Sequence, residues 1–521
     1  MLEGCSPEPA GGPLEVPGDG VPRWMAAADL LVGTGSGLQA GSFAPHASVG
    51  AVQRILRAAD IDFGAIRTDL GLSEEFGAAA AAEAERAADR CAAHRDDRTD
   101  LPLVTIDPPG SVDLDQAVHI ARDGKGFVVH YAIADVAALV QPGGPLDLET
   151  RRRGQTIYFP DGNVPLHPRA LSENSGSLLP DQVRPAVLWR IAVDAEGHPT
   201  SVDVHRALVR SVARLDYETV QADADAGRLH PSIEALPDFG ELRQRLSIER
   251  GAVELGLPEQ DVMRDAQGAW QLVVQPRTRA DMWNSQVSLL TGMCAGQMML
   301  DSKVGLLRTL PSATDDAVEV FRAAANALNV PWPENVSPGA FLAGLDPQSP
   351  LTLAVMSDAT TLLRGSDYLP MLGEIPDDAV TTHGGIAGVY AHVTAPLRRL
   401  ADRFATETCL SLTAGRAVPD WVCDALPTLP EVMKSSSSVA SKADRSSLDM
   451  AEAILLADRV GETFTATVLH AARGKRPAQI FIADPAVFAT CTGDPPEGRQ
   501  VRVTLTAADA QAPKLLFTAE T

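Results

Sequence analysis

Three aspartates, Asp107, Asp113 and Asp115, lie within nine residues of one another. Asp113 and Asp115 are two positions apart, so on an extended strand both side chains point to the same face. A Pro-Pro-Gly run at 108–110 favours a turn that separates Asp107 from the other two carboxylates. Carboxylate oxygens gathered at one point are the ligands that a hard divalent cation such as Mg²⁺ requires. The alternative is an acidic surface loop, which the apolar, strand-like residues at 101–106 make less favourable.

A second cluster of chemically useful residues lies at 390–402, in the sequence YAHVTAPLRRLAD. Pro396 suits the first turn of a helix, because its missing N–H would have no partner there. Arg398 and Arg399 would then lie in that first turn, where the positive end of the helix and two guanidinium groups favour a phosphate. The alternative is that Arg398 pairs with Asp402 on the helix surface.

Two adjacent aromatic residues, Tyr158 and Phe159, lie on a short extended segment that ends at Pro160. A ring at this place can stack on a nucleobase, which contributes on the order of 1–3 kcal/mol per base. The alternative is that both rings belong to the core. Aromatic residues make up only 5% of the chain, so we do not expect an extensive stacking surface.

The formal net charge of the chain is −24, which taken alone argues against a polyanionic partner. A local basic channel can still bind phosphate while the outer surface stays acidic. Basic residues cluster at 151–153, 398–403 and 473–476. Ordinary solvated surface is the alternative interpretation of each cluster.

Cysteine usage and hydropathy indicate where the protein acts. The six cysteines are scattered with no close pair, which argues against a zinc site and a disulfide framework. No apolar run approaches the roughly 20 residues that a membrane-spanning helix needs. The amino terminus also lacks the basic start and apolar core of a secretory signal. We therefore expect a cytoplasmic protein with no membrane partner.

The elements that must position these residues are strands first and helices later, an order typical of an α+β domain. We expect strands at 104–106, 117–121, 127–134, 187–193 and 201–210, then helices at 281–300, 314–328, 351–363 and 396–412. Further short strands, spaced as in a small β-barrel, are expected at 463–469, 479–483, 500–506 and 514–518.

The chain is thus expected to be a multidomain α+β protein. The four parts are a disordered Pro- and Gly-rich tail over 1–23, a helical domain over 24–96, a large α+β domain over 97–455 and an OB-fold barrel over 456–521.

Two segments leave alternatives open. In the amino-terminal part, helical patterns at 49–61 and 75–94 flank a segment that favours a helix-turn-helix shape, which is also common as plain packing. The Ser-rich segment 436–446 is either a linker or part of a helix that continues to Leu456.

Several of these segments resemble the signature of the ribonuclease II and ribonuclease R catalytic domain. The matching segments, which follow the family's order, are 105–116, 131–136, the Tyr158 segment, 171–179 and 394–399. The resemblance implies a Mg²⁺-dependent hydrolytic exoribonuclease that threads single-stranded RNA 3′ end first into a channel. Such enzymes release nucleoside 5′-monophosphates, and we expect a monomer.

The resemblance also assigns the metal ligands. Asp107, Asp113 and Asp115 match three of the four family aspartates around the metal, and Asp115 would lie nearest the metal and the attacking water. The fourth aspartate is replaced by Gln116, which offers one neutral oxygen. The resemblance therefore implies a site in which metal affinity is lowered or a second ion is lost.

The remaining family roles concern the RNA. Tyr158 matches the aromatic residue that packs on the 3′-terminal nucleotide, and Arg398 matches the arginine that contacts the scissile phosphate. Arg399 and His392, in the same motif, are further candidates for substrate binding. The candidate phosphate contacts of the barrel are Arg473, Lys475 and Arg476.

Two further departures from the family pattern keep other functions open. The segment near Ser285 and Gln286 lacks the acidic residues that often help to hold the terminal ribose, and the amino-terminal part does not resemble paired cold-shock barrels. One alternative is a catalytically impaired RNA-binding protein of the same fold. Another is a DNA- or RNA-binding regulator that acts through the amino-terminal helices.

Overall fold

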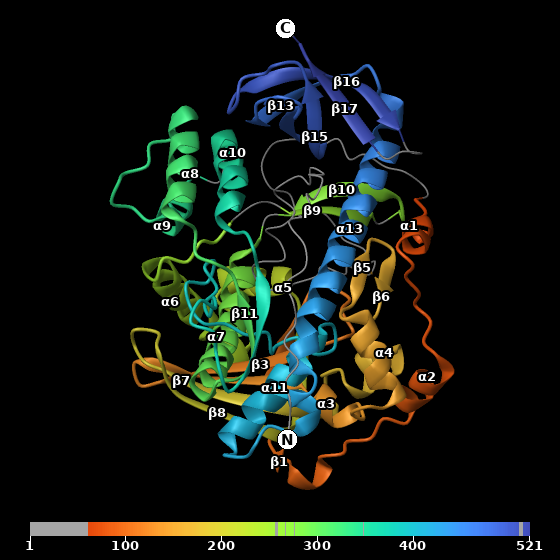
Figure 1. The fold of residues 1–521 in the computed structure, drawn as a ribbon, viewed down its shortest axis with the longest axis vertical. Coiled ribbons are helices and arrows are strands. Elements are labelled where there is room, and N and C mark those ends of the chain that lie inside the picture. Colours follow the sequence, from red (N-terminus) through yellow and green to blue (C-terminus); the bar gives the residue numbers. More distant parts are fainter. Residues whose placement is uncertain are drawn as a thin grey trace, which may run out of the picture.

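A computed structural model describes residues 61–255, 259–265, 267–275, 277–346, 349–509 and 514–520. The expected tail over 1–23 and nearly all of the helical segment expected at 49–61 lie outside these residues. Figure 1 shows a lower body of strands and helices and a small barrel above it, joined by one long helix, α13.

The first described segment, residues 61–96, follows the outside of the molecule as short helices joined by loops (Figure 1). The elements are α1 (Gly64–Asp69), α2 (Ala78–Glu85) and η2 (Ala92–His94). The single Ala-rich helix expected over 75–94 is therefore wrong, since α2 ends at Glu85. The cause is tertiary: Arg95 has a fully buried side chain that pairs with Asp89 and Asp135, and this requires the chain to leave its helical course.

Five strands of the main sheet pair in a ring. They are β2 (Leu103–Ile106), β3 (Gln116–Asp123), β4 (Gly126–Ala134), β7 (Val183–Val193) and β8 (Pro199–Leu215), with β1 (Asp96–Asp97) added along β8. The long strand β8 pairs with β7 over its first part and with β2 over its last part, which closes the ring. Each expected strand is confirmed in this sheet and is one to seven residues longer than expected.

Helices from the second half of the domain cover the sheet. They are α5 (Tyr217–Asp225), η4 (Pro231–Ile233), α6 (Leu236–Glu249), α7 (Arg279–Ser302) and α11 (Leu400–Thr413). The helix α7 begins at a capping box made by Thr278 and Asp281. Its Trp283 and Val287 belong to the same buried cluster as Val129 of β4. The helix expected from Pro396 begins instead at Leu400, so the two arginines of the second cluster precede it.

Short elements connect β4 to β7 and lie next to the sheet. They are α3 (Val136–Leu139), α4 (Pro145–Arg153), β5 (Ile157–Phe159), β6 (Gly162–Val164) and η3 (Leu171–Ser175). The strands β5 and β6 form a hairpin that carries Tyr158.

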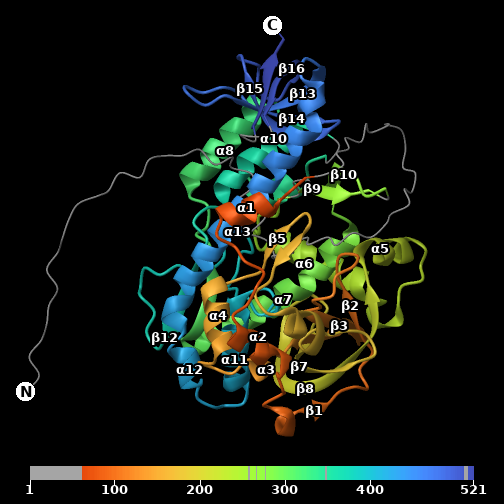
Figure 2. The same cartoon turned by 90° about the vertical axis from the view of Figure 1, so that its right-hand side faces the viewer.

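A layer of helices lies between the sheet and the barrel. It contains β11 (Val304–Thr309), α8 (Asp315–Ala327), α9 (Pro338–Ala343), α10 (Pro350–Ala359), η5 (Thr360–Leu362) and β12 (Asp367–Leu372). Phe321, Trp332 and Phe341 are the aromatic residues of its core, which also includes Leu469 and Phe481 of the barrel. The barrel is thus packed directly on these helices (Figure 2).

The connection to the barrel is helical. After α12 (Asp420–Cys423) and η6 (Leu426–Thr428), the helix α13 (Leu429–Leu456) is followed by η7 (Ala457–Arg459). The Ser-rich segment 436–446 therefore belongs to a helix and not to a linker. Its serines are accommodated because Ser436 donates to the Met433 carbonyl, and Ser447, just beyond the segment, donates to that of Ala443.

The carboxy-terminal strands form a closed five-stranded barrel. They are β13 (Thr463–His470), β14 (Ala478–Ala483), β15 (Ala486–Thr492), β16 (Gln500–Asp509) and β17 (Lys514–Ala519), in the order β13-β14-β15-β17-β16. β15 and β17 are parallel and the other pairs are antiparallel. The hairpin β9 (Glu259–Arg264) and β10 (Trp270–Gln275) lies beside α13. The predicted α+β architecture with a carboxy-terminal barrel is confirmed, and the exact domain boundaries stay a prediction.

None of the helices in the described part of the chain combines the length and the apolar character that crossing a membrane demands.

A buried carboxyl on α13 faces the β9–β10 hairpin. Glu452 accepts a hydrogen bond of 2.7 Å from Gln260 Nε2. Burial, with a smaller contribution from the neighbouring charge of Asp449, raises the pKa of Glu452 to about 8. The junction between α13 and this hairpin is therefore sensitive to pH.

We expect Glu452→Gln to remove a loss of stability that accompanies the rise in pH from about 4.5 to about 8. With a pKa raised from 4.5 to about 8, Glu452 contributes stability that is complete below pH 4.5 and is lost as the pH rises through about 8. The parent should thus lose free energy of unfolding between about pH 6 and pH 9, on a scale of about 1.4 kcal/mol per pKa unit. Urea unfolding at both pH values measures this. The exposed Glu431→Gln on the same helix should keep the parent's slope, and an unchanged slope in Glu452→Gln would contradict the assignment.

Candidate active site

The three aspartates lie in the loop between β2 and β3. Asp107 follows the last residue of β2, and Asp113 and Asp115 precede the first residue of β3. Asp113 and Asp115 are therefore in extended loop, not on the strand that the spacing predicted. Leu114, between them, is fully buried.

Ser177 fixes this loop from the segment 171–179. Its hydroxyl donates to the Val112 carbonyl at 2.7 Å and accepts from the Leu114 N–H at 2.9 Å. The Leu178 N–H donates to the Leu114 carbonyl at 3.0 Å. These bonds give the carboxylate loop a defined backbone course.

The segment before α11 closes over Asp115. The Leu397 N–H donates to Asp115 Oδ1 at 2.7 Å, and Arg398 Nε lies 3.4 Å from Asp115 Oδ2. The alternative that Arg398 pairs with Asp402 is wrong. It is Arg399 that pairs with Asp402, with its Nη2 2.7 Å from Oδ1, while Arg398 faces the carboxylates.

Tyr158 is brought to the same point. Its hydroxyl lies 3.5 Å from Asp113 Oδ2, at the outer limit of a hydrogen bond. The backbone of this segment is tied to the arginine segment, because the Thr156 N–H donates to the Arg398 carbonyl at 2.9 Å. Tyr158 is half-buried, whereas Phe159 is buried under the guanidinium of Arg67. The ring of Tyr158 thus lies at the carboxylate cluster, and the ring of Phe159 lies in the core.

The electrostatics of the cluster favour a bound cation. Burial, opposed by Arg398 and reinforced by the charge of Asp113, raises the pKa of Asp107 to about 7. Burial likewise raises the pKa of Asp113, and it raises the pKa of Asp115 well above its ordinary value. Asp107 Oδ2 is buried with no hydrogen-bond partner among the described residues. Three neighbouring carboxylates, one of them with a buried oxygen that lacks a hydrogen-bond partner, fit a hard divalent cation. Such a cation would stabilise the charged form of each carboxylate.

Gln116, in place of the fourth aspartate, has both ends of its amide engaged. Its Nε2 donates to the Thr394 carbonyl at 2.7 Å, and its Oε1 accepts from the Tyr131 hydroxyl. The same hydroxyl lies 2.8 Å from Ser288 Oγ of α7. The amide therefore joins β3, β4 and the arginine segment. Its oxygen keeps a second lone pair, so the prediction that it serves as a metal ligand stays a prediction.

His392 lies in a buried aromatic cluster. Its Nδ1 is 2.7 Å from the Tyr368 hydroxyl, and its ring meets that of Tyr390 edge to face. Burial, together with the charges of Arg399 and Arg308, holds the pKa of His392 well below its ordinary value. In this structure its contacts are structural, and its role in substrate binding stays a prediction.

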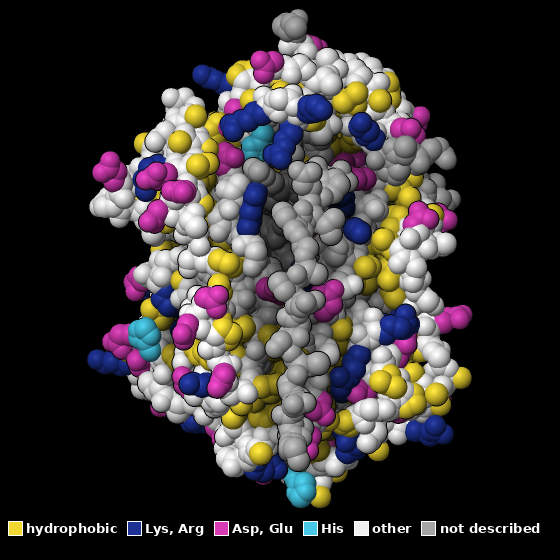
Figure 3. Space-filling view, viewed as in Figure 1, with side chains coloured by type: hydrophobic (Ala, Val, Ile, Leu, Met, Phe, Trp, Pro, Cys, Tyr) yellow, Lys and Arg dark blue, Asp and Glu magenta, His cyan; other side chains and the backbone are white. Residues whose placement is uncertain are grey.

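The predicted basic residues of the barrel are exposed and lie away from the carboxylates. Arg473, Lys475 and Arg476 form the turn between β13 and β14. Figure 3 shows Lys and Arg side chains gathered over the barrel on the face it draws. The structure thus brings together Asp107, Asp113, Asp115, Tyr158 and Arg398 but places this basic turn at the barrel.

No pattern in the sequence predicted one residue of the site, Arg214. Arg214, at the end of β8, donates to the Ser111 carbonyl in the aspartate loop at 3.1 Å, and its charge lowers the pKa of Asp107. It reaches the loop because Arg214 is paired with Thr105 of β2, 109 positions earlier (214 − 105). Only the strand pairing reveals this contact.

The geometry has a counterpart in known proteins. Residues 95–408 match the family model described as the RNB domain, and residues 462–520 match the RNase II-type exonuclease C-terminal S1 domain. The chain belongs to the RNB family. The resemblance found in the sequence motifs is therefore confirmed, and so is the RNB-type fold with its carboxy-terminal barrel.

Individual members of the RNB family support this placement. Ribonuclease R of Escherichia coli is 30% identical over 332 residues, which are 61% of this chain and 40% of that protein. The human exosome complex exonuclease RRP44 is 27% identical over 326 residues, 59% of this chain and 33% of that protein. The chain thus spans less than half of the length of these relatives.

Two solved structures share the RNB fold with this chain. Ribonuclease R of Mycoplasma genitalium, in complex with ribose-methylated single-stranded RNA, superposes with a TM-score of 0.79 at 19% identity, over 88% of this chain and 77% of that one. Yeast Ssd1, described as a pseudonuclease, gives a TM-score of 0.61 at 15% identity, over 75% of this chain and 49% of that one. The fold is therefore shared by a protein named as a ribonuclease and by one described as a pseudonuclease.

The contacts of Gln116 predict the effect of restoring an acid at this position. Gln116→Glu should lower the free energy of unfolding in the absence of metal by about 1–3 kcal/mol, because a carboxylate cannot donate to the buried Thr394 carbonyl. Urea unfolding in a chelator measures this. The exposed Gln267→Glu makes the same chemical change in a surface turn and should alter the value by less than about 0.5 kcal/mol. Equal stability of Gln116→Glu and the parent would contradict the role of the amide.

Proposed function

We propose that the protein is a Mg²⁺-dependent hydrolytic exoribonuclease that degrades single-stranded RNA from its 3′ end to nucleoside 5′-monophosphates. The observation that carries the proposal is the convergence of the buried Asp115, the half-buried Asp107 and Asp113, Arg398 and Tyr158 at one point. The names of the RNB relatives, and the single-stranded RNA in complex with the M. genitalium protein, support the choice of substrate.

The residues divide the chemistry between them. Asp107, Asp113 and Asp115 would hold the cation, with Gln116 as a further oxygen, and the bound cation supplies an activated water and neutralises charge on the phosphate. Attack of a water on the last phosphodiester would break its bond to the 3′ oxygen of the preceding nucleotide. The 5′-phosphate then stays on the departing nucleotide, and the shortened RNA keeps a 3′-hydroxyl. Arg398 places a guanidinium beside Asp115, where it can donate to the phosphoryl oxygens as negative charge develops.

Other groups would hold the RNA. Tyr158 offers a half-buried ring next to Asp113 for the 3′-terminal nucleotide. Arg399 lies next to Arg398, although its guanidinium pairs with Asp402. The exposed basic turn of the barrel would attract the backbone upstream of the cleaved bond. A monomeric state and a cytoplasmic location stay predictions from the sequence.

The second candidate function is a catalytically inactive RNA-binding protein. It is favoured by Gln116 in place of an aspartate and by the shared fold of yeast Ssd1. Such a protein should bind single-stranded RNA without any Mg²⁺-dependent product. The regulator hypothesis depends on the amino-terminal helices. Of these, the segment expected at 49–61 lies almost entirely outside the described residues, and the helix expected at 75–94 ends at Glu85.

The first test is the shortening of a 5′-labelled single-stranded RNA in Mg²⁺. We expect Asp115→Asn to lower the rate on the order of 10²-fold or more, since it removes the charged ligand nearest Arg398. The exposed Asp123→Asn, at the other end of β3, should cleave like the parent. A parent that binds this RNA but leaves it intact would favour the inactive candidate, and an active Asp115→Asn would place the chemistry elsewhere.

The second test concerns the guanidinium of Arg398. Arg398→Lys keeps the charge but loses the planar fork, so we expect kcat to fall about 10- to 100-fold while RNA affinity changes less. Single-turnover kinetics and equilibrium binding measure the two effects. The exposed Arg416→Lys, just after α11, serves as the matched control. A fall in affinity with kcat unchanged would show that Arg398 only binds the RNA.

A further inference from the structure

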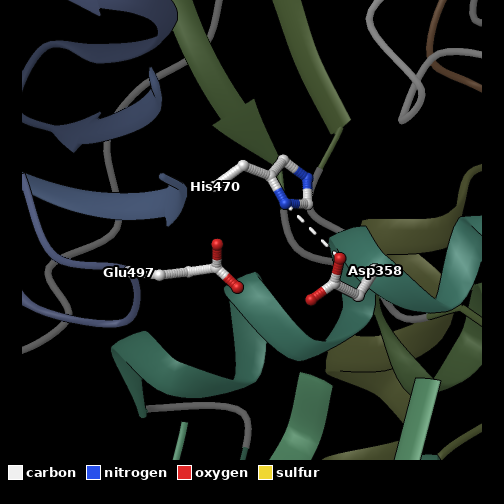
Figure 4. Close-up of side chains that lie close together, drawn as sticks. All are labelled: Asp358, His470 and Glu497. Carbon is white, nitrogen blue, oxygen red and sulfur yellow. Dashed lines mark ion pairs between the residues drawn. The ribbon is translucent and has the colours of Figure 1, made fainter. Parts of the chain in front are cut away.

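Three potential metal ligands meet where the barrel contacts the helical layer. They are Asp358 near the end of α10, His470 at the end of β13 and Glu497 in the loop between β15 and β16. One ligand atom from each lies within 4.8 Å of the other two, and Figure 4 shows the three side chains directed toward a common space. This cluster contains none of the residues of the carboxylate site.

The ring of His470 is already oriented for coordination. Its Nδ1 lies 3.4 Å from Asp358 Oδ1, and its Nε2 lies 3.1 Å from the hydroxyl of Ser357. A partner on the second ring nitrogen is the usual arrangement around a metal-bound histidine, because it fixes the tautomer and the plane of the ring. Here Nδ1 is directed at the carboxylates while Ser357 holds Nε2.

The loop that carries Glu497 is held in place by several contacts. Glu497 Oε2 accepts from the Ala471 N–H at 2.9 Å, and the Gly498 N–H donates to the Val468 carbonyl at 2.8 Å. Gly498 has a φ of +71°, and a Cβ there would lie 2.3 Å from a methyl group of Leu328. The loop is therefore pressed against the helical layer, and the position of Glu497 is set by the fold.

We propose that Asp358, His470 and Glu497 form a site for a transition-metal dication, of which Zn²⁺ is the best fit, that joins the barrel to α10. One imidazole and two carboxylates are ligands that Zn²⁺ accepts, and the imidazole disfavours Mg²⁺ and Ca²⁺. With bonds of about 2.1 Å, tetrahedral ligand atoms lie about 3.4 Å apart, so small side-chain rotations bring this cluster to coordination distance. The fourth position is left for water.

A metal ion at this cluster would compete with a proton on His470. His470 lies between two acids, and Arg473 Nη2 lies 3.6 Å from Glu497 Oε2. Arg473 is 79% exposed, so solvent weakens its pairing with Glu497. A dication would interact with both carboxylates at once, whereas a protonated imidazole adds a single charge. The three ligands are 112 and 27 positions apart (358 to 470 and 470 to 497), which is why their sequence spacing gives no sign of a site.

The test is the retention of Zn²⁺ by the full chain after dialysis against excess Mg²⁺, which is added to compete for the carboxylate site. We expect the parent to retain one equivalent of Zn²⁺ by elemental analysis and His470→Ala to retain none. The exposed His198→Ala, in the turn between β7 and β8, should behave like the parent. Equal retention by the parent and His470→Ala, or none by either, would overturn the proposal.

Two further measurements keep the proposal testable if His470→Ala does not fold. Asp358→Asn and Glu497→Gln conserve shape, and each should weaken Zn²⁺ binding at least about 10-fold. Co²⁺ bound to the parent should show the visible absorption of a tetrahedral site, and this absorption should be lost in both variants. A melting temperature of the parent that does not respond to Zn²⁺ would overturn the proposal. These readouts do not depend on RNA cleavage, so their failure is distinct from failure of the proposed function.

Discussion

The arrangement of the active site depends on how Asp115 is held. Its carboxylate accepts from the Leu397 N–H at 2.7 Å and faces Arg398 at 3.4 Å, across 282 positions of sequence. These contacts fix the β2–β3 loop to the segment before α11. That segment is held in turn by Asp402, which accepts from the Ala395 N–H at 2.7 Å. Displacing Asp115 would thus separate the carboxylates from the guanidinium that is expected to act with them.

The same arrangement concentrates like charges in a buried place. The pKa values of Asp107, Asp113 and Asp115 are all raised by burial. The charge of Arg398 only partly opposes this at each of them, and that of Arg214 does so at Asp107. A site of this kind is more stable with a bound cation than without one, because the cation restores the charged form of each acid. The overall charge of −24 therefore does not exclude a nucleic-acid partner, since the charges that matter are arranged locally.

The sequence predicted what depends on local patterns and missed what depends on long-range contacts. The strands of the main sheet followed from their apolar residues, and the meeting of Asp107, Asp115 and Arg398 followed from the resemblance. The short α2 did not, because Arg95 pairs with the buried Asp135, 40 positions further along the chain. The start of α11 at Leu400 did not either, although the pair of Arg399 and Asp402 beside it is local. Contacts made by strand pairing, such as that of Arg214, leave no local signal.

The central claim is that the three aspartates and Arg398 form one hydrolytic site for the 3′ end of RNA. The most direct measurement is the identity of the mononucleotides that the parent releases from an unlabelled single-stranded RNA in Mg²⁺, determined by mass spectrometry. The account predicts nucleoside 5′-monophosphates that appear in order from the 3′ end and disappear with a chelator. Release of nucleoside 3′-phosphates, or of products that do not depend on a divalent cation, would contradict it.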